Sequence, residues 1–489
     1  MLYIGIDLGT SAVKLLLMDE KGSILHQVSR DYPVEYPHPG WSQQNPEDWW
    51  LRVQEGITVL LKDQEAHKVK GIGVAGQMHG LVALDHAGQV IRPAILWNDS
   101  RTQPQTDFLN QDPGKEALSR LTGNIAFAGF TAPKLLWMRQ EEPNLFARIA
   151  KILLPKDYIN YRLTGVLSTD YSDASGTLLL DVEKGCWSQP MLDLCGITQD
   201  QLPPLHKSLE PIGTVKPDLA RRLGLPRGVT VCAGAGDNAA AAVGCGVVGP
   251  GKCNISLGTS GTVFITGEQF AVDENNALHS FRHADGGYHL MGCILSAASC
   301  NQWWMENILH TKDYSEEQQF ISKETLGCNP VYFLPYLMGE RSPHNDALVR
   351  GAFFGLSMDT PREAMTQAVL EGVAFAIRDC VEIAKGQGIP VTSSRLCGGG
   401  AKSPLWQTIL ANVLGIPLEL PQTEQGPGYG GAILAAVACG EAEDLTSYAN
   451  RLCKVKAKIL PEPGLVRRYQ KRYQAWKQLY PRLKGWCGE

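Results

Sequence analysis

The residue best suited to chemistry is Asp237, a carboxylate that directly follows the stretch Ala233-Gly234-Ala235-Gly236. The pattern predicts a strand that turns at the glycines into an alanine-rich helix over residues 239–243. A carboxylate at a helix N-terminus stays ionised because the helix dipole favours negative charge there. Such a group is suited to accept the proton of an alcohol during phosphoryl transfer. It is also suited to act as the helix N-cap, and the two roles are compatible.

The same glycines match the pattern Gly-x-Gly-x-x-Ala, which is typical of dinucleotide-binding domains. That interpretation requires an acidic residue about 20 positions further on to bind the ribose. Residues 238–267 contain neither Asp nor Glu. We therefore reject a nicotinamide-dependent dehydrogenase.

Two Gly-Thr-Ser turns between strand-like segments form a second chemical feature. The first is Asp7-Leu8-Gly9-Thr10-Ser11, and the second is Gly258-Thr259-Ser260-Gly261. Small residues let backbone N–H groups approach phosphate oxygens, and the hydroxyl groups add donors. The sequence has no Gly-x-x-x-x-Gly-Lys-Ser/Thr loop, so phosphate binding would fall to these turns. Both are also compatible with ordinary hairpins, but two of them, each near the start of a half-chain, indicate two related domains.

A third feature is the turn Gln77-Met78-His79-Gly80, between strand-like residues 69–74 and 81–84. Its amide, imidazole and exposed backbone are suited to bind several sugar hydroxyls. A structural turn with a solvent-exposed histidine is the alternative. The stretch Trp97-Asn98-Asp99-Ser100-Arg101 is suited to add sugar contacts or to form a structural loop.

Three glycines, Gly398-Gly399-Gly400, follow the predicted strand 394–396 and precede Ala401. Glycines at such a point permit close approach by a flat ligand such as adenine or ribose. A simple turn is the alternative.

The chain has 489 residues, of which 44% are hydrophobic. A chain of this length is too long for a single hydrophobic core, so the elements that position these residues should belong to more than one domain. Two large domains or three smaller ones are expected, and Pro250-Gly251-Lys252 predicts a boundary that separates residues 1–248 from residues 249–489. The pattern also predicts a long helix over 362–380 and a terminal helix after residue 462 that docks on the body.

The overall composition favours a small-molecule ligand. The net charge is −5 and no Lys/Arg run occurs, which excludes a typical nucleic-acid binder. The 13 cysteines are scattered, without Cys-x-x-Cys spacing, as expected for a reducing compartment. Because neither a signal peptide nor an apolar run of about 18 residues is visible, we expect a cytoplasmic protein without membrane contacts.

Taken together, these motifs resemble the FGGY family of carbohydrate kinases over essentially the whole chain. Residues 129–137, Gly-Phe-Thr-Ala-Pro-Lys-Leu-Leu-Trp, are similar to the first signature of that family, and residues 351–356 with 368–372 are similar to the second. The Gln77–Gly80 turn together with Gly236–Ala239 most resembles the family members that act on D-xylulose. Glycerol kinases carry an Arg-Glu pair near that turn instead.

The resemblance implies an α/β fold of two actin-like (ribonuclease H-like) ATPase domains with a cleft between them, and the cofactors ATP and Mg²⁺. It implies that Asp237 is the catalytic base and that Asp7 holds Mg²⁺ through water. It implies that Met78, His79 and Asn238 contact the sugar, and from the residues themselves we also expect Gln77 and Trp97 to bind the substrate. The ATP-binding residues that we expect are Thr10, Ser11, Lys14, Gly258, Thr259, Gly399, Gly400, Ala401 and Asn412.

The expected reaction is therefore transfer of the γ-phosphoryl group of ATP to D-xylulose. A kinase for L-ribulose, gluconate or a polyol is also compatible with the sequence, because only a few hydrogen bonds distinguish the stereochemistry of one substrate from another. A non-enzymatic actin-like nucleotide switch is disfavoured, since a switch needs no base for an alcohol. Whether the chain forms a homodimer also stays open.

Overall fold

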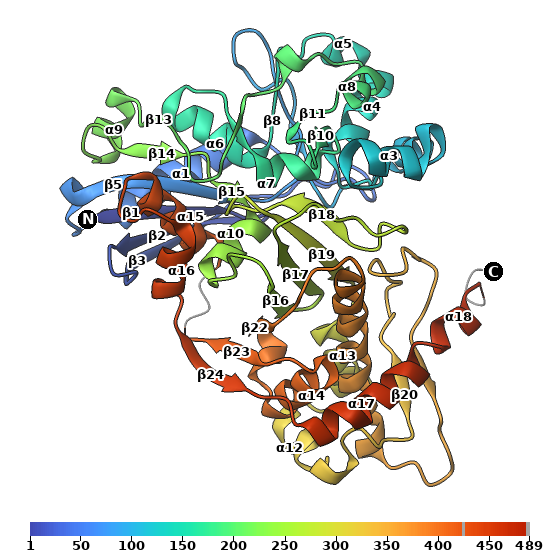
Figure 1. Ribbon diagram of the computed structural model, residues 1–489. Coiled ribbons are helices and arrows are strands. Elements are labelled where there is room, and N and C mark those ends of the chain that lie inside the picture. The colour runs from blue at the N-terminus through green and yellow to red at the C-terminus, as the bar shows by residue number, and fades with distance from the viewer. Residues whose placement is uncertain (423–425, 486–489) are drawn as a thin grey trace.

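The computed structural model describes residues 1–422 and 426–485, which form two lobes, each around a seven-stranded sheet (Figure 1). The strands of the first sheet are, in spatial order, β13 (Pro211–Thr214), β14 (Thr230–Cys232), β5 (Val69–Gly76), β1 (Leu2–Leu8), β2 (Ala12–Asp19) and β3 (Ile24–Asp31), with β15 (Ala235–Gly236) also paired to β5. β1, β2 and β3 are antiparallel to one another, whereas β5 is parallel to β1, and β14 is parallel to β5.

The second sheet repeats this pattern. Its strands are, in spatial order, β18 (His279–Arg282), β19 (Tyr288–Ile294), β17 (Gly261–Gly267), β16 (Lys252–Leu257), β22 (Ser393–Cys397), β23 (Leu418–Pro421) and β24 (Val455–Ile459). β19, β17 and β16 are antiparallel neighbours, and β16, β22 and β23 are parallel neighbours. The two Gly-Thr-Ser turns therefore occupy equivalent hairpins, and the predicted α/β fold of two actin-like domains is confirmed.

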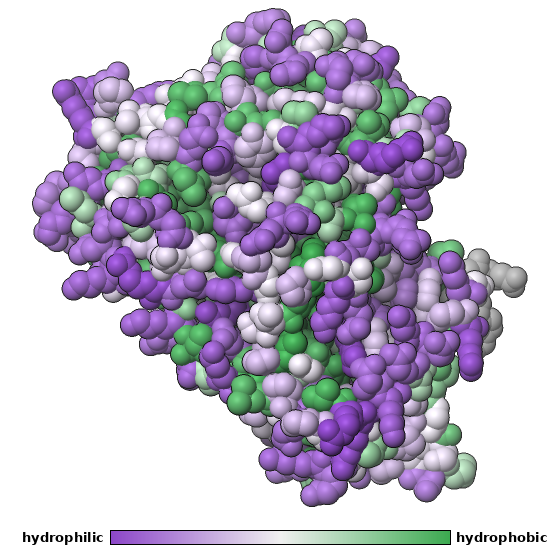
Figure 2. Space-filling view, viewed as in Figure 1, coloured by the Kyte–Doolittle hydropathy of each residue, from purple (hydrophilic) through white to green (hydrophobic). Residues whose placement is uncertain are grey.

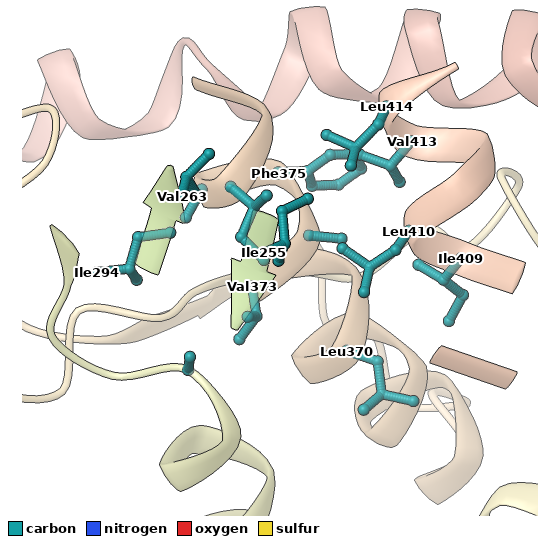
Figure 3. Close-up of a cluster of buried hydrophobic side chains, with 14 of the residues drawn as sticks. Ile255, Val263, Ile294, Leu370, Val373, Phe375, Ile409, Leu410, Val413 and Leu414 are labelled. Atoms are coloured by element: carbon teal, nitrogen blue, oxygen red, sulfur yellow. The ribbon is translucent and has the colours of Figure 1, made fainter. Parts of the chain in front are cut away.

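The core of the second lobe forms between its sheet and the helices α13 (Arg362–Gly386) and α14 (Pro404–Leu414). Ile255 and Val263 of the hairpin meet Phe375 of α13 and Leu410 of α14 in one buried cluster (Figure 3). The last long helix, α17 (Pro463–Trp476), buries its aromatic residues in the same cluster. The predicted docking helix is confirmed.

One helix from late in the sequence packs on the first lobe. α15 (Pro427–Ala438) lies against β1, β5 and α10 (Asp237–Gly244), so that red and blue segments meet in Figure 1. A side chain at Gly5 would lie 1.8 Å from the carbonyl oxygen of Gly428, and one at Gly73 would lie 2.0 Å from that of Gly431. Glycines therefore allow the helix and sheet backbones to approach closely. The division at residues 248 and 249 stays a prediction, since packing crosses it here.

The other elements surround these two sheets. In the first half they are β4 (Gln43–Gln44), α1 (Pro46–Leu60), β6 (Val82–Leu84), β7 (Ala94–Ile95), α2 (Gln103–Leu109), α3 (Lys115–Thr122), α4 (Thr131–Glu141), α5 (Pro143–Phe146), β8 (Lys151–Leu153), α6 (Pro155–Thr164), β9 (Thr169–Asp170), α7 (Tyr171–Ala174), β10 (Leu180–Asp181), β11 (Cys186–Trp187), α8 (Gln189–Cys195), β12 (Leu205–His206) and α9 (Pro217–Leu223). In the second half they are α11 (Ala298–Gln302), α12 (Tyr314–Gln319), β20 (Tyr332–Leu334), β21 (Ala352–Phe354), α16 (Leu445–Leu452) and α18 (Leu479–Leu483).

The molecular surface is mixed in polarity. Polar side chains cover most of the face in Figure 2, and apolar ones appear in smaller patches between them. Within residues 1–422 and 426–485, no helix has the length and apolar character needed to cross a membrane.

Candidate active site

Asp237 is the first residue of α10, at the point where β15 ends. Gly236 precedes the helix as its N-cap, so Asp237 is not itself the cap. Its Oδ1 accepts hydrogen bonds from the backbone N–H of Asn238 at 2.7 Å and from Nδ2 of Asn238 at 3.0 Å. Burial, together with the negative charge of Asp7, raises the pKa of Asp237 to about 7, so the expectation that its place at a helix N-terminus keeps it fully ionised is wrong near neutral pH. A carboxylate with a pKa near the working pH is well matched to general-base catalysis.

Asp7 lies near the end of β1, next to the first Gly-Thr-Ser turn and opposite Lys14 of β2. Burial raises the pKa of its carboxyl group to about 6, and the positive charge of Lys14 opposes that rise. Asp7, Lys14 and Gly428 line a hollow of about 550 Å³. The carboxylate accepts no hydrogen bond from any residue that the structure describes. A free carboxylate beside an open hollow fits a hard cation that keeps most of its waters.

His79 is held in a single neutral form. Its Nδ1 lies 2.6 Å from the carbonyl oxygen of Gly176. Because a carbonyl only accepts, Nδ1 carries the hydrogen, and Nε2 is left as an acceptor. Burial lowers the pKa of His79 to about 3, and the ring stacks on Phe130 with 4.7 Å between centroids. The alternative of a solvent-exposed histidine is wrong.

The backbone of His79 is also restrained. Its φ of +69° is left-handed, which is uncommon for a residue other than glycine. Its carbonyl oxygen accepts hydrogen bonds from Oγ1 of Thr131 at 3.1 Å and from Nζ of Lys134 at 2.8 Å. Lys134 is fully buried, and burial lowers its pKa to about 7. Sequence reasoning noticed Thr131 and Lys134 only as part of a family signature and missed this positioning role.

The turns that carry His79 and Asp237 meet at Met78 and Asn238. The Sδ atom of Met78 lies 3.8 Å from Nδ2 of Asn238. A side chain at Gly236 would lie within 3.0 Å of Met78, so the glycine permits this contact. The structure therefore brings the predicted sugar turn and the predicted base together.

The second hairpin meets the three-glycine turn. Gly398 has a φ of +90°, and a side chain there would lie 2.7 Å from the backbone of Leu257. The segment before α11 also holds the tip of the hairpin, because the carbonyl oxygen of Thr259 accepts from the backbone N–H of Ala297 at 3.0 Å. The two glycine-rich segments, which include Gly258, therefore lie side by side.

A hollow of about 580 Å³ opens beside this turn, within the usual size range of small-ligand pockets. Gly399 and Gly400 line it, together with Gln302 and with Gln318 of α12. Sequence reasoning missed the two glutamines, since polar residues on short helices give no distinctive signal. The side chain of Ala401 is buried in the core cluster of this lobe.

Asn412, one of the expected ATP-binding residues, is held by the backbone of its own lobe. It lies in α14 and is only 1% exposed. Its Nδ2 donates to the carbonyl oxygen of Thr408 at 2.8 Å, and its Oδ1 accepts from the backbone N–H of Glu462 at 2.7 Å. Both ends of the amide thus bind the backbone of the protein, and a contact between Asn412 and ATP stays a prediction.

Trp97 lies beside the first Gly-Thr-Ser hairpin. Its Nε1 donates to Oγ1 of Thr10 at 3.0 Å, and the residue is 47% exposed. Ser11 is exposed in the same turn. A contact between Trp97 and the sugar stays a prediction.

Two lobes of repeated actin-like topology with paired hydroxyl-bearing hairpins are the architecture of actin-like ATPases, and the family matches place this chain among the kinases of that class. Residues 2–244 match the N-terminal domain of the FGGY family of carbohydrate kinases, and residues 253–439 match the C-terminal domain. The chain belongs to the FGGY family of carbohydrate kinases, as the sequence motifs predicted. Kinases of this family act on a sugar with ATP.

Individual relatives match over their full length. The xylulose kinase of Escherichia coli (strain K12) is 40% identical over 484 residues, which cover 99% of each chain. The solved "xyloylose kinase" of Brucella ovis is 41% identical, with a TM-score of 0.93 and 99% of each chain covered. The gluconate kinase of Lactobacillus acidophilus has the same TM-score of 0.93 at 26% identity, with 100% of this chain and 99% of that chain covered.

Proposed function

We propose that this protein phosphorylates D-xylulose with ATP to form D-xylulose 5-phosphate. The observation that carries this proposal is the contact between Met78 and Asn238, which joins the His79 turn to the turn of Asp237. The full-length relative at 40% identity is named a xylulose kinase, and this name supports the ketose assignment. Gluconate is the second candidate, because a 26% identical neighbour of the same fold is named a gluconate kinase.

In the proposed mechanism, Asp237 accepts the proton of the attacking sugar hydroxyl while the two hairpins hold the phosphates. Neutral Nε2 of His79 accepts a hydrogen bond from another hydroxyl and so orients the sugar. Asp7 would hold Mg²⁺ through water, and the bound cation would supply positive charge to the phosphate oxygens. Gly399 and Gly400 would border the nucleoside.

A substrate panel tests the function. ADP release is measured with D-xylulose, L-ribulose, gluconate and glycerol at equal concentrations. We expect D-xylulose to have the highest kcat/KM, and mass spectrometry of the product to show one added phosphoryl group. A higher kcat/KM for gluconate would replace the ketose assignment with the second candidate.

His79→Ala tests the sugar turn. Losing one directional hydrogen bond in a desolvated pocket costs about 1–3 kcal/mol, so kcat/KM for D-xylulose should fall roughly 5- to 150-fold. The apparent affinity for ATP should be unchanged, because His79 is assigned to the sugar alone. Steady-state kinetics with each substrate varied in turn measure both values.

The control for this variant is His86→Ala, which changes an exposed histidine in the turn after β6. It should retain the kinetics of the unmodified protein. If His79→Ala also retained them, the turn would be structural and the ketose assignment would lose its main residue-level support.

A further inference from the structure

Gln44 in β4 has a side-chain amide whose hydrogen-bonding groups are all engaged within the protein. The residue is 1% exposed. Its Nε2 donates to the carbonyl oxygens of Thr10 at 2.7 Å and Pro33 at 3.0 Å. Its Oε1 accepts from Nε1 of Trp49 at 3.0 Å and from Nε2 of Gln77 at 3.2 Å. One side chain therefore joins four separate segments of the first lobe.

The orientation of the Gln44 amide follows from the chemistry of its partners. Carbonyl groups only accept and an indole N–H only donates, so the NH₂ group must face Thr10 while the oxygen faces Trp49. Gln77 must then present its own NH₂ group to Gln44. As a result, Oε1 of Gln77 is buried without a hydrogen-bond partner among the described residues. Buried acceptors are normally paired, and a sugar hydroxyl can supply the missing donor.

The hydrogen bonds of Gln44 link a segment that we assign to ATP with a segment that we assign to the sugar. Thr10 is at the tip of the first phosphate hairpin, and Gln77 begins the sugar turn. The hairpin tip is tied a second time, because Nε1 of Trp97 donates to Oγ1 of Thr10. Since this bond uses the hydroxyl oxygen as an acceptor, the hydroxyl hydrogen of Thr10 stays available for a phosphate oxygen.

We propose that Gln44 is a positioning residue for phosphoryl transfer, which fixes the phosphate hairpin relative to the sugar turn and orients the amide of Gln77. The inference rests on the proposed roles of those two turns. In-line transfer is sensitive to geometry, and a misplacement of about 1 Å costs about 10²-fold in rate. Loss of the connection should therefore slow transfer while both substrates still bind.

Gln44→Glu is the principal test. Glutamate keeps an acceptor for Trp49 and Gln77 but turns an oxygen toward the carbonyl groups of Thr10 and Pro33. We expect kcat with D-xylulose to fall about 10- to 100-fold, with little change in KM for either substrate. Misaligned phosphate should also react more often with water, so ADP release should exceed sugar phosphate formation. Gln44→Met removes every hydrogen bond without adding charge, so kcat should fall likewise, and KM for D-xylulose should rise because Gln77 is no longer oriented. This variant gives the deciding result if the glutamate variant does not fold.

The matched control is Gln105→Glu in α2, which makes the same change at a residue that is 6% exposed and whose Nε2 donates to Gln140 at 2.7 Å. It should keep full kcat per folded molecule and equal yields of ADP and sugar phosphate. Gln44 variants with unchanged kcat and equal yields would overturn the proposal, as would losses that match the control after correction for folded protein. If D-xylulose is not a substrate of the unmodified protein, the proposed function fails separately, and the test is run with the sugar that the panel identifies.

Discussion

Asp237→Asn should lower kcat for D-xylulose phosphorylation by roughly 10²- to 10⁴-fold, the usual contribution of a general base. Asparagine keeps the shape of the side chain and its acceptor for the N–H of Asn238, but it cannot take a proton from the sugar. The affinity for ATP should stay nearly unchanged, because Asp237 is assigned to the acceptor hydroxyl. Rapid-quench measurement of sugar phosphate, with calorimetric titration of an ATP analogue, checks both expectations.

Asp444→Asn is the matched control for this variant. Asp444 is a true N-cap, whose Oδ1 accepts from the backbone N–H groups of Thr446 and Ser447 at the start of α16. Asparagine also caps helices well, so this change should leave kcat intact. If Asp237→Asn were as mild as Asp444→Asn, Asp237 would serve the helix and not the reaction.

The pH dependence of kcat/KM in the unmodified protein tests the role of Asp237 independently of any substitution. Burial and the charge of Asp7 raise the pKa of Asp237 to about 7. The base is active only when deprotonated, so kcat/KM should rise with pH and level off above about pH 7. His79 should add no second limb in this range, because its pKa is lowered to about 3.

Asp7→Asn should produce the second large loss, about 10²- to 10³-fold in kcat, which is typical when one preorganised electrostatic group is removed from a transition state. The change removes the carboxylate charge that would hold Mg²⁺ through water. Half-maximal activity should therefore require more magnesium than in the unmodified protein. A titration of activity against Mg²⁺ at saturating ATP and D-xylulose measures both effects.

Asp7→Asn should also change the pH dependence of the residual activity. Without the negative charge of Asp7, the pKa of Asp237 should fall, so the acid limb of the residual activity should move to lower pH. Asp19→Asn, at the far end of β2, serves as the control, since Asp19 accepts hydrogen bonds within its own turn. An unchanged magnesium requirement in Asp7→Asn would contradict the role assigned to Asp7.

The sequence by itself determined the architecture and the family. Both hairpins, the helix that begins at Asp237 and the terminal docking helix follow from local patterns, because glycine turns, alternating strands and helical periodicity are properties of neighbouring residues. Motifs such as Gly-Asp-Asn and residues 129–137 carried the resemblance for the same reason.

Only the tertiary structure decided how distant segments meet. Asn412 is expected at the nucleotide from the resemblance alone, and only the structure shows that its Oδ1 accepts from the backbone N–H of Glu462, 50 positions further on. The tautomer of His79 depends on the carbonyl group of Gly176, and the orientation of Gln77 depends on Gln44 and Trp49. α15 packs against the first sheet although it comes late in the chain. Such contacts depend on long-range packing and on the geometry of hydrogen bonds between elements, which local sequence patterns do not encode.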